Sequence, residues 1–317
     1  MNPVMQTATR HALRQQGLAF CVLALVFVLL MAVFPVWNAG LETAVLATLI
    51  FFLGLPHGAF DVIFAQRLYR LVSLGQWAVF CLAYVALAAV VVGFWWLLPS
   101  VFLAAFLLVS AFHFSGDLEV GTSVMLRFWY AASMLIFPAW FHEADVARLF
   151  GALVAGDFAG QMAGVLHSMA LPWCAGLVIT LVVQWRCHWL TRLEVVSVSL
   201  LAMAAPPLFG FAVFFCLMHS ARHALRTRAY AAELAWAELL KKAIAPMAVC
   251  ALAAAALWPT LKGLTLDTAI VRILFVALAA LTVPHMVLIE RVRLLGWQSS
   301  SNSNSNSNST SEKPPGL

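Results

Sequence analysis

The feature that most constrains this chain is a series of long apolar stretches separated by short polar segments. Several of them reach the roughly 20 helical residues that cross a hydrocarbon core about 30 Å thick. Only 10% of the residues are charged and 64% are hydrophobic, whereas an average soluble domain carries about 25% charged residues. A chain in lipid must satisfy its own backbone hydrogen bonds. The sequence therefore predicts an all-α, polytopic transmembrane helical bundle in a cell membrane.

The apolar stretches predict about ten spans, with eight as the lower limit. The candidate spans are 18–37, 42–66, 76–98, 100–117, 123–141, 171–187, 192–205, 206–224, 243–260 and 267–289. Segment 192–205 is too short to cross and ends at Pro206-Pro207, so we expect a tilted or broken helix there. The connection 142–170 is the longest and is expected to hold a helix that lies in the membrane interface.

The composition predicts one folded domain with two flanking segments. The transmembrane helical domain covers 18–293 and follows a cytoplasmic N-terminal segment, 1–17. The Ser/Asn-rich tail, 294–317, cannot bury enough apolar surface to offset the entropy of ordering it. We therefore expect the tail to be disordered and to carry no chemistry.

Basic residues gather in the loops at one side of the predicted bundle. With ten spans, one side receives Arg10, Arg14, Arg67, Arg70, Arg186, Arg192, Arg222, Arg226, Arg228, Lys241, Lys242, Arg291 and Arg293. Arg222 is interpreted here as the start of a basic loop. An excess of Lys and Arg marks cytoplasmic loops, so both termini are predicted to lie in the cytoplasm. The same loops account for the net charge of +5, so no nucleic-acid partner is predicted.

Five of the nine histidines stand inside or at the ends of apolar helices, in four distinctive local sequences. These are GLPHGAFD (residues 54–61), FHFSGD (112–117), MHSARH (218–223) and VPH (283–285). With ten spans, all four helices run toward the cytoplasm, and each histidine is expected in the last third of its helix. An ionisable group inside a membrane is costly. Five histidines at one depth therefore argue for a shared partner.

The spacing of these histidines favours a metal site. His219 and His223 are four residues apart and share one helical face, which lets both imidazoles bind one ion. His57 and His113 complete the candidate set. Four neutral imidazoles without a thiolate do not match a closed structural zinc site, and imidazole suits iron, copper and zinc alike. A ferrous ion held in this way keeps coordination positions free for dioxygen.

Two aspartates follow candidate histidines at the same distance. Asp61 stands four residues after His57, and Asp117 stands four residues after His113. Metal-bound imidazoles usually give their second N–H to a carboxylate or a carbonyl, so we expect these aspartates to accept such bonds, more plausibly from a neighbouring helix than from their own. His285 alone is more typical of a structural histidine. The histidines not expected to bind metal are His11, His142, His167 and His188.

Other functions also use histidines inside a helical bundle. Bis-histidine haem b would make the chain an electron-transfer protein, although the HxxxD and HxxxH spacings argue mildly against it. In a proton-coupled transporter the same histidines would relay protons. A desaturase-like di-iron site would need more histidines and HxxHH clusters, whereas one HxxxH occurs here. Metal content and an optical spectrum separate these alternatives.

The four motifs, in this order, resemble those of the bacterial and archaeal Brp/Blh proteins, membrane enzymes described as β-carotene 15,15'-dioxygenases and associated with microbial rhodopsins. The resemblance runs from about residue 45 to 290. It implies that 18–293 is a catalytic domain that cleaves β-carotene with O₂ at the central bond to give two retinals. It also suggests a functional link to a microbial rhodopsin. The implied Fe(2+) ligands and catalytic residues fall on His57, His113, His219 and His223, with His285 as a further ligand or a pocket residue. Aromatic residues would line the polyene path, and Tyr84 and Tyr130 are mid-helix candidates.

Overall fold

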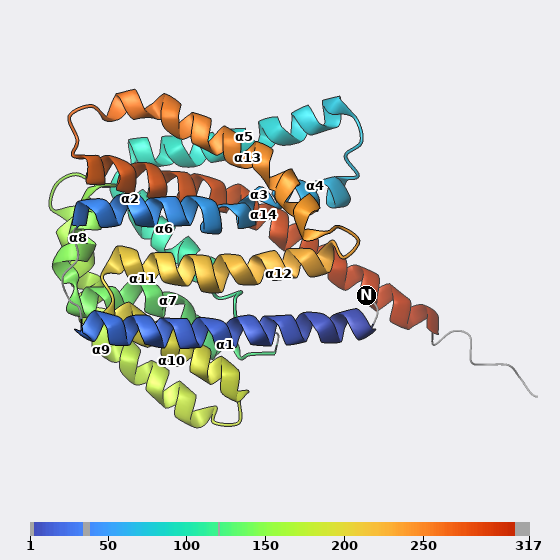
Figure 1. The fold of residues 1–317 in the computed structure, drawn as a ribbon, viewed down its shortest axis with the longest axis horizontal. Helices are drawn as coiled ribbons and strands as arrows, with labels where there is room; N and C mark the ends of the chain where they lie inside the picture. Colours follow the sequence, from blue (N-terminus) through green and yellow to red (C-terminus); the bar gives the residue numbers. More distant parts are fainter. Residues whose placement is uncertain (1–2, 34–38, 120, 308–317) are drawn as a thin grey trace, which may run out of the picture.

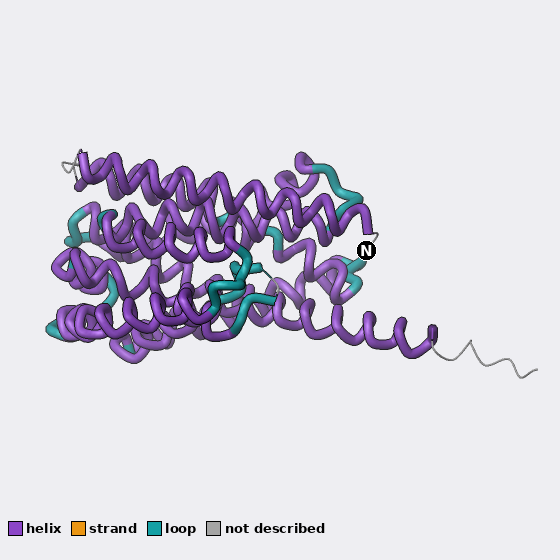
Figure 2. Tube along the Cα trace, turned by 90° about the horizontal axis from the view of Figure 1, so that it is seen from below, coloured by secondary structure: helices purple, strands orange, loops and turns teal. Residues whose placement is uncertain are grey.

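The computed structural model describes residues 3–33, 39–119 and 121–307. Within these ranges the chain is helical apart from short connections and contains no strand (Figures 1 and 2). Most of the helices run along the long axis of a single bundle. The prediction of an all-α helical bundle is therefore confirmed.

The helical elements follow one another with few residues between them. In chain order they are α1 (Pro3–Val33), α2 (Ala39–Leu49), η1 (Ile50–Gly54), α3 (Pro56–Ala59), α4 (Asp61–Tyr69), α5 (Leu74–Leu97), α6 (Pro99–Phe114), α7 (Val124–Phe141), α8 (Glu143–Gly151), α9 (Phe158–Val183), α10 (Trp189–Ala204), α11 (Pro207–Val213), η2 (Phe214–Ser220), α12 (Ala221–Tyr230), α13 (Trp236–Leu257), η3 (Trp258–Leu261) and α14 (Leu266–Ser307). The short elements η1 and η2 are π-helical turns inside longer helices.

Eight helical stretches among the described residues are long and apolar enough to cross a membrane. They are Thr7–Val33, Thr43–Tyr69, Leu74–Leu97, Val124–Phe141, Phe158–Val183, Pro207–Tyr230, Trp236–Leu261 and Leu266–Val292. Each of the ten predicted spans falls on a helix, but α6 and α10 hold only 16 residues each, fewer than the roughly 20 that a crossing takes. The number of long spans is thus the lower limit of the prediction.

Two predicted boundaries differ from the structure in the middle of the chain. The span predicted to begin at residue 171 begins at Phe158 as α9, and Pro172 lies inside this helix. Gly and His residues dilute the apolar pattern before Pro172, and neighbouring helices let a transmembrane helix tolerate an internal proline. The rest of the long connection forms the short helix α8, whose first turn carries Glu143 and Asp145. Acidic residues there complement the helix dipole.

The two ends of the chain are more helical than the composition indicates. Helix α1 begins at Pro3, so most of segment 1–17 belongs to the first helix. Helix α14 continues to Ser307, into the tail predicted to be disordered. A helix that is already nucleated elongates at little further cost, which composition alone does not register. Residues 1–2, 34–38 and 308–317, on which parts of these predictions fall, lie outside the described residues.

The stretch Pro207–Tyr230, made of α11, η2 and α12, is the innermost part of the bundle. In its most apolar window 67% of the residues are buried, whereas the corresponding value is 0% for the stretches that contain α5 and α13. Helix α7 packs against α9 and α10, and α1 packs against α10. The helix that carries the MHSARH motif is thus surrounded by other helices, while α5 and α13 lie at one edge of the bundle (Figure 1).

Helix α1 begins, and α14 ends, at the same end of the bundle (Figure 1). This arrangement agrees with the even number of crossings that the loop charges predict. The side of the membrane that this end faces stays a prediction.

Candidate metal centre

The five motif histidines, which come from four separate parts of the chain, meet at one place. His57 lies in α3, His113 at the end of α6, His219 in η2, His223 in α12 and His285 in α14. The closest pair of ring centroids, His113 and His219, is 4.6 Å apart, and His223 and His285 are 5.0 Å apart. His57 lies 5.0 to 5.6 Å from three of the other rings. The structure thus assembles the cluster that the motifs predicted.

The spacing of the ring nitrogens suits a single metal ion. One nitrogen from each of His57, His113 and His285 lies within 4.8 Å of the other two. Imidazole nitrogens bind metals at about 2 Å, so ligands on opposite sides of an ion are roughly 4 Å apart. His285, which the sequence alone left between ligand and structural residue, is one of these three.

Both aspartates accept hydrogen bonds from histidines of other helices. His285 Nδ1 donates to Asp61 Oδ1 over 2.7 Å, and His219 Nδ1 donates to Asp117 Oδ1 over 2.9 Å. The two members of each pair are 224 and 102 residues apart in the sequence. This is the cross-helix arrangement that the HxxxD spacing favoured. A proton held on Nδ1 leaves the Nε2 lone pair of each ring available as a ligand.

The Nε2 atoms of His219 and His285 are buried and have no hydrogen-bond partner. Both residues are 2% exposed. A buried polar atom without a partner costs about 1–3 kcal/mol. Imidazole nitrogens are donors that suit a metal ion, so an ion bound at the cluster would offset this cost.

His57 and His223 are oriented by polar groups other than carboxylates. His57 Nδ1 contacts the Gly54 carbonyl and, at 3.1 Å, the Ser220 hydroxyl. His223 Nδ1 lies 3.3 Å from the Thr227 hydroxyl, which also donates to the His223 carbonyl over 2.9 Å. In both rings Nδ1 therefore faces a polar group of the protein, which fixes the orientation of the ring.

The local backbone is unusual where two of the motifs begin. The π-helical turn η1 ends at Gly54, three residues before His57, and η2 contains His219. Single π-helical turns are rare and occur frequently at functional sites. A side chain at Gly54 would place its Cβ 2.5 Å from the Phe215 ring, so glycine is required where η1 and η2 pack. The sequence did not predict the two π-helical turns.

Each aspartate also lies near a tyrosine on the helix that follows it. Tyr84 of α5 donates to Asp61 Oδ2 over 2.8 Å, and the Tyr130 hydroxyl of α7 is 3.5 Å from Asp117 Oδ2. The sequence indicated both tyrosines only as candidates to line the polyene path. Their contacts with the aspartates have no signal in local spacing, because the residues are on different helices.

A buried ion pair supports the Asp117 side of the cluster. Arg222 is 4% exposed and donates to Glu194 over 2.6 Å and to the Asp117 carbonyl over 3.0 Å. Arg226 donates to the same carbonyl over 2.8 Å. A Cβ at Gly17 would lie 2.1 Å from Glu194 Oε1, so only glycine lets α1 pass this pair. Arg222 was interpreted as the start of a basic loop, and this was wrong because its partner is on a distant helix.

The histidine cluster lies deeper in the bundle than predicted. His57 is near the middle of Thr43–Tyr69, and His219 is near the middle of Pro207–Tyr230. His113 at the end of α6, His223 and His285 do lie in the last third of their helical stretches. The predicted depth was wrong because the helical stretches that contain His57 and His219 continue beyond residues 66 and 224, the predicted ends of these spans.

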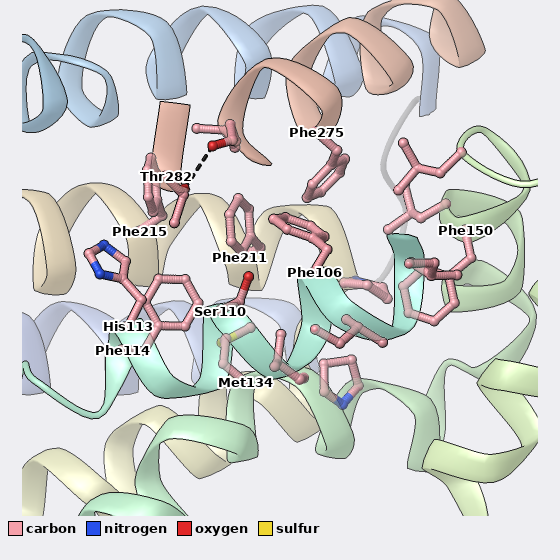
Figure 3. Close-up of a pocket in the computed structure, with 18 of the residues that line it drawn as sticks. Phe106, Ser110, His113, Phe114, Met134, Phe150, Phe211, Phe215, Phe275 and Thr282 are labelled. Carbon is pink, nitrogen blue, oxygen red and sulfur yellow. Dashed lines mark hydrogen bonds between the residues drawn. The ribbon is translucent and has the colours of Figure 1, made fainter. Parts of the chain in front are cut away.

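Two cavities adjoin the cluster, and His57 lines both of them. We call them the α6 cavity and the α5 cavity. The α6 cavity is lined by His57, His113 and mainly apolar side chains of α6, α7, α8, α11 and α14 (Figure 3). The α5 cavity, of about 380 Å³, is lined by Asp61, Tyr84, His285 and apolar residues of α5 and α13. Leu278 and Thr282 also line both cavities.

Three of the remaining histidines have contacts elsewhere. His167 Nδ1 lies 3.0 Å from the Ala139 carbonyl and 3.2 Å from Glu143. His188 and His142 are the residues immediately before α10 and α8. That these histidines bind no metal stays a prediction.

Comparison with known proteins gives one family and one curated relative. The family model described as beta-carotene 15,15'-dioxygenase matches residues 48–292. A protein named beta-carotene 15,15'-dioxygenase, from uncultured marine bacterium 66A03, is 28% identical over an alignment of 264 residues, and the match covers 76% of this chain and 90% of the relative. No solved structure matches the chain. The matched range contains all five clustered histidines and both aspartates.

Proposed function

The chain belongs to the β-carotene 15,15'-dioxygenase family, and on this basis we propose that it is a membrane enzyme that cleaves β-carotene at the central 15,15' double bond. The observation that carries the proposal is the histidine cluster with two apolar cavities beside it. A site for a long polyene needs both a reactive centre and apolar space on either side of it.

The proposed cofactor is Fe(2+). His57, His113, His219 and His223 would hold it and act as the catalytic residues, and the orphaned Nε2 of His285 supports this residue as a further ligand. Neutral imidazoles suit iron, and ferrous iron would supply activation of dioxygen in an open coordination position. A haem or proton-transport function gains no support from a cluster in which His57, His113 and His285 each offer a nitrogen within 4.8 Å of the other two.

The protein's own residues would orient the ligands and the substrate. Asp61 and Asp117 keep the Nδ1 protons of their histidines in place and so direct the Nε2 atoms inward. The apolar side chains of the two cavities exclude water from the polyene. One O₂ and one carbon–carbon double bond become two carbonyl groups, so the reaction forms two twenty-carbon aldehydes and needs no further reductant.

The membrane setting fits the substrate. β-Carotene dissolves in lipid, and the α5 cavity lies beside α5, in which no residue is buried. We propose that carotene enters from the bilayer on this side, in the cell membrane. Retinal made there could supply a microbial rhodopsin as a partner.

The test is expression of the chain in cells that make β-carotene, followed by purification. We expect bleaching of the cells, accumulation of retinal, one bound iron and consumption of one O₂ per carotene. The variant His113→Ala should lose iron and activity, whereas the matched control His188→Ala, outside the cluster, should keep both. Carotene that stays unchanged with iron-loaded protein, or a haem spectrum in the pure protein, would contradict the proposal.

A further inference from the structure

One face of α6 lines the α6 cavity along its length. Leu103, Phe106, Leu107, Ser110 and His113 line it at intervals of three or four residues, so they follow the same side of the helix. Figure 3 shows His113 and Phe150 at opposite ends of this row, with Phe106 and Ser110 between them. Ten residues separate Leu103 from His113, which is about 15 Å at 1.5 Å per helical residue.

The far end of the α6 cavity is closed by α8 and the turn after it. Leu149, Phe150 and Leu153 line this end, which we call the end wall. Leu103 and Leu153 belong to one buried cluster, against which Phe150 packs. Trp95 Nε1 donates to the Leu153 carbonyl over 2.9 Å, and Arg272 Nε donates to the Ala152 carbonyl over 2.5 Å. Side chains from α5 and α14 thus fix the backbone of the end wall.

The α6 cavity must widen to take a ligand. About 90 Å³ is open in it, which is less than a twenty-carbon half of carotene occupies. The rings of Phe106 and Phe211 each lie beside Phe275, with centroids 6.5 and 5.4 Å apart. These three side chains are partly buried, as are Leu149 and Phe150, but the backbone of the end wall is in addition held by the hydrogen bonds to its carbonyls.

We propose that the α6 cavity measures one half of the substrate, with Leu149, Phe150 and Leu153 as the residues that set the position of cleavage. This inference rests on the proposed function and deepens it. Carotene is about as long as the hydrocarbon core is thick, about 30 Å, so half of it matches the length of α6 from Leu103 to His113. A ring against the end wall brings the central double bond to the histidines.

A symmetric substrate needs only one measured half. When one ring is seated against the end wall, the central bond is fixed at the cluster whatever holds the other half. The α5 cavity, which would take that other half, lies between α5 and α13 at the edge of the bundle. A single closed arm is therefore sufficient for central cleavage.

The test is the product pattern of Phe150→Ala and of Leu149→Ala, each of which deepens the end of the cavity. Off-centre apocarotenals should rise at least about tenfold relative to retinal, the discrimination that one methylene of pocket space provides. The control is Phe141→Ala, which removes a side chain that is 61% exposed and should leave the pattern unchanged. Products are separated by chromatography, and bound iron should stay at the wild-type level in all three variants.

The outcomes separate this inference from the proposed function. Retinal as the sole product of both end-wall variants would overturn the measuring role and leave the dioxygenase assignment intact. The same shift in the Phe141→Ala control would also overturn it. If the wild-type protein loaded with iron cleaves no carotene, the proposed function itself fails. Leu149→Ala, a smaller change than Phe150→Ala, provides the test where the larger truncation prevents folding.

Discussion

Asp61 and Asp117 occupy the same position in two HxxxD motifs, yet their surroundings differ. Each accepts a hydrogen bond from a histidine of another helix, and each has a tyrosine within 3.5 Å. The backbone of Asp117 is also held by Arg222 and Arg226, whereas Asp61 borders the α5 cavity. The same histidine–aspartate hydrogen bond thus occurs twice. Around Asp117 it lies inside the bundle, and around Asp61 it lies beside the cavity proposed for the substrate.

This difference suggests a division of roles. The Asp117 half is tied to α1 and α10 through Gln16 and Glu194, which both bond Arg222. It therefore couples the metal centre to the folded bundle. The Asp61 half is bordered by α4, α5 and α14, so a change there reaches the substrate cavity as well as the cluster. Variants of matched residues in the two halves can test this division.

The largest effect is expected from the two histidines that the aspartates hold. His219→Ala and His285→Ala should each lower iron affinity by more than the roughly 100-fold that marks the upper range for changes behind a ligand. The reason is that both Nε2 atoms are buried without another partner. Iron content of the purified variants measures this, with His188→Ala as control. Normal iron retention in His285→Ala would contradict the comparison, because the Asp61 half would then contribute no metal ligand through His285.

The next largest effect concerns stability in the Asp117 half. Arg222→Met leaves the Glu194 carboxylate buried without its partner and should destabilise the protein by about 3–5 kcal/mol. Replacing both residues with methionine should restore most of that stability, because no charge stays unpaired. Unfolding in detergent measures the difference. If the single and the double variant were both as stable as the wild type, the Arg222–Glu194 ion pair would contribute little to the stability of the bundle.

The aspartates themselves should have intermediate and unequal effects. Asp61→Asn and Asp117→Asn each weaken a bond to a metal-bound imidazole, which typically costs about 10–100-fold in affinity or activity. Asp117→Asn should fall near the upper limit, because it also removes the negative charge beside Arg222 and Arg226. Asp61→Asn should fall near the lower limit. The activity and the iron content of the two variants are to be measured side by side. If Asp61→Asn lowers them more than Asp117→Asn does, the proposed division of roles is reversed.

The sequence predicted the cluster because of one strong physical constraint. Histidines such as His57 and His219 are costly in lipid, so their placement in apolar helices indicates a function. The HxxxD spacing also predicted that Asp61 and Asp117 would bond across helices. It could not predict which histidine each would reach, because the partners are 224 and 102 residues away.

The features that the sequence did not predict depend on contacts between distant helices. Glu194 and Arg222 look like ordinary surface charges until α10 and α12 are packed together. The need for Gly17 follows only from that pair. The depth of the cluster was misplaced because helix ends in a membrane depend on neighbouring helices as well as on hydropathy. Local patterns therefore identified the histidines and aspartates that cluster, and packing determined which residues support them.

The smallest effect is expected from the two tyrosines, and it makes the sharpest comparison. Tyr84→Phe removes a hydrogen bond of 2.8 Å to Asp61, and a bond of this kind is worth about 1.5–3 kcal/mol when the acceptor is charged. Tyr130→Phe removes a contact of 3.5 Å, which is beyond the usual O–H···O range of about 2.5–3.0 Å. Because Tyr84 acts on the cluster only through Asp61, Tyr84→Phe should reduce carotene cleavage by less than the roughly tenfold expected of Asp61→Asn, and Tyr130→Phe should change it little. The spectrum of a Co(2+)-substituted protein should shift in Tyr84→Phe, since the bond acts through Asp61 on His285, and it should stay unchanged in Tyr130→Phe. Equal losses of activity in both variants, without any spectral change, would mean that the tyrosines act on packing and not on the histidines.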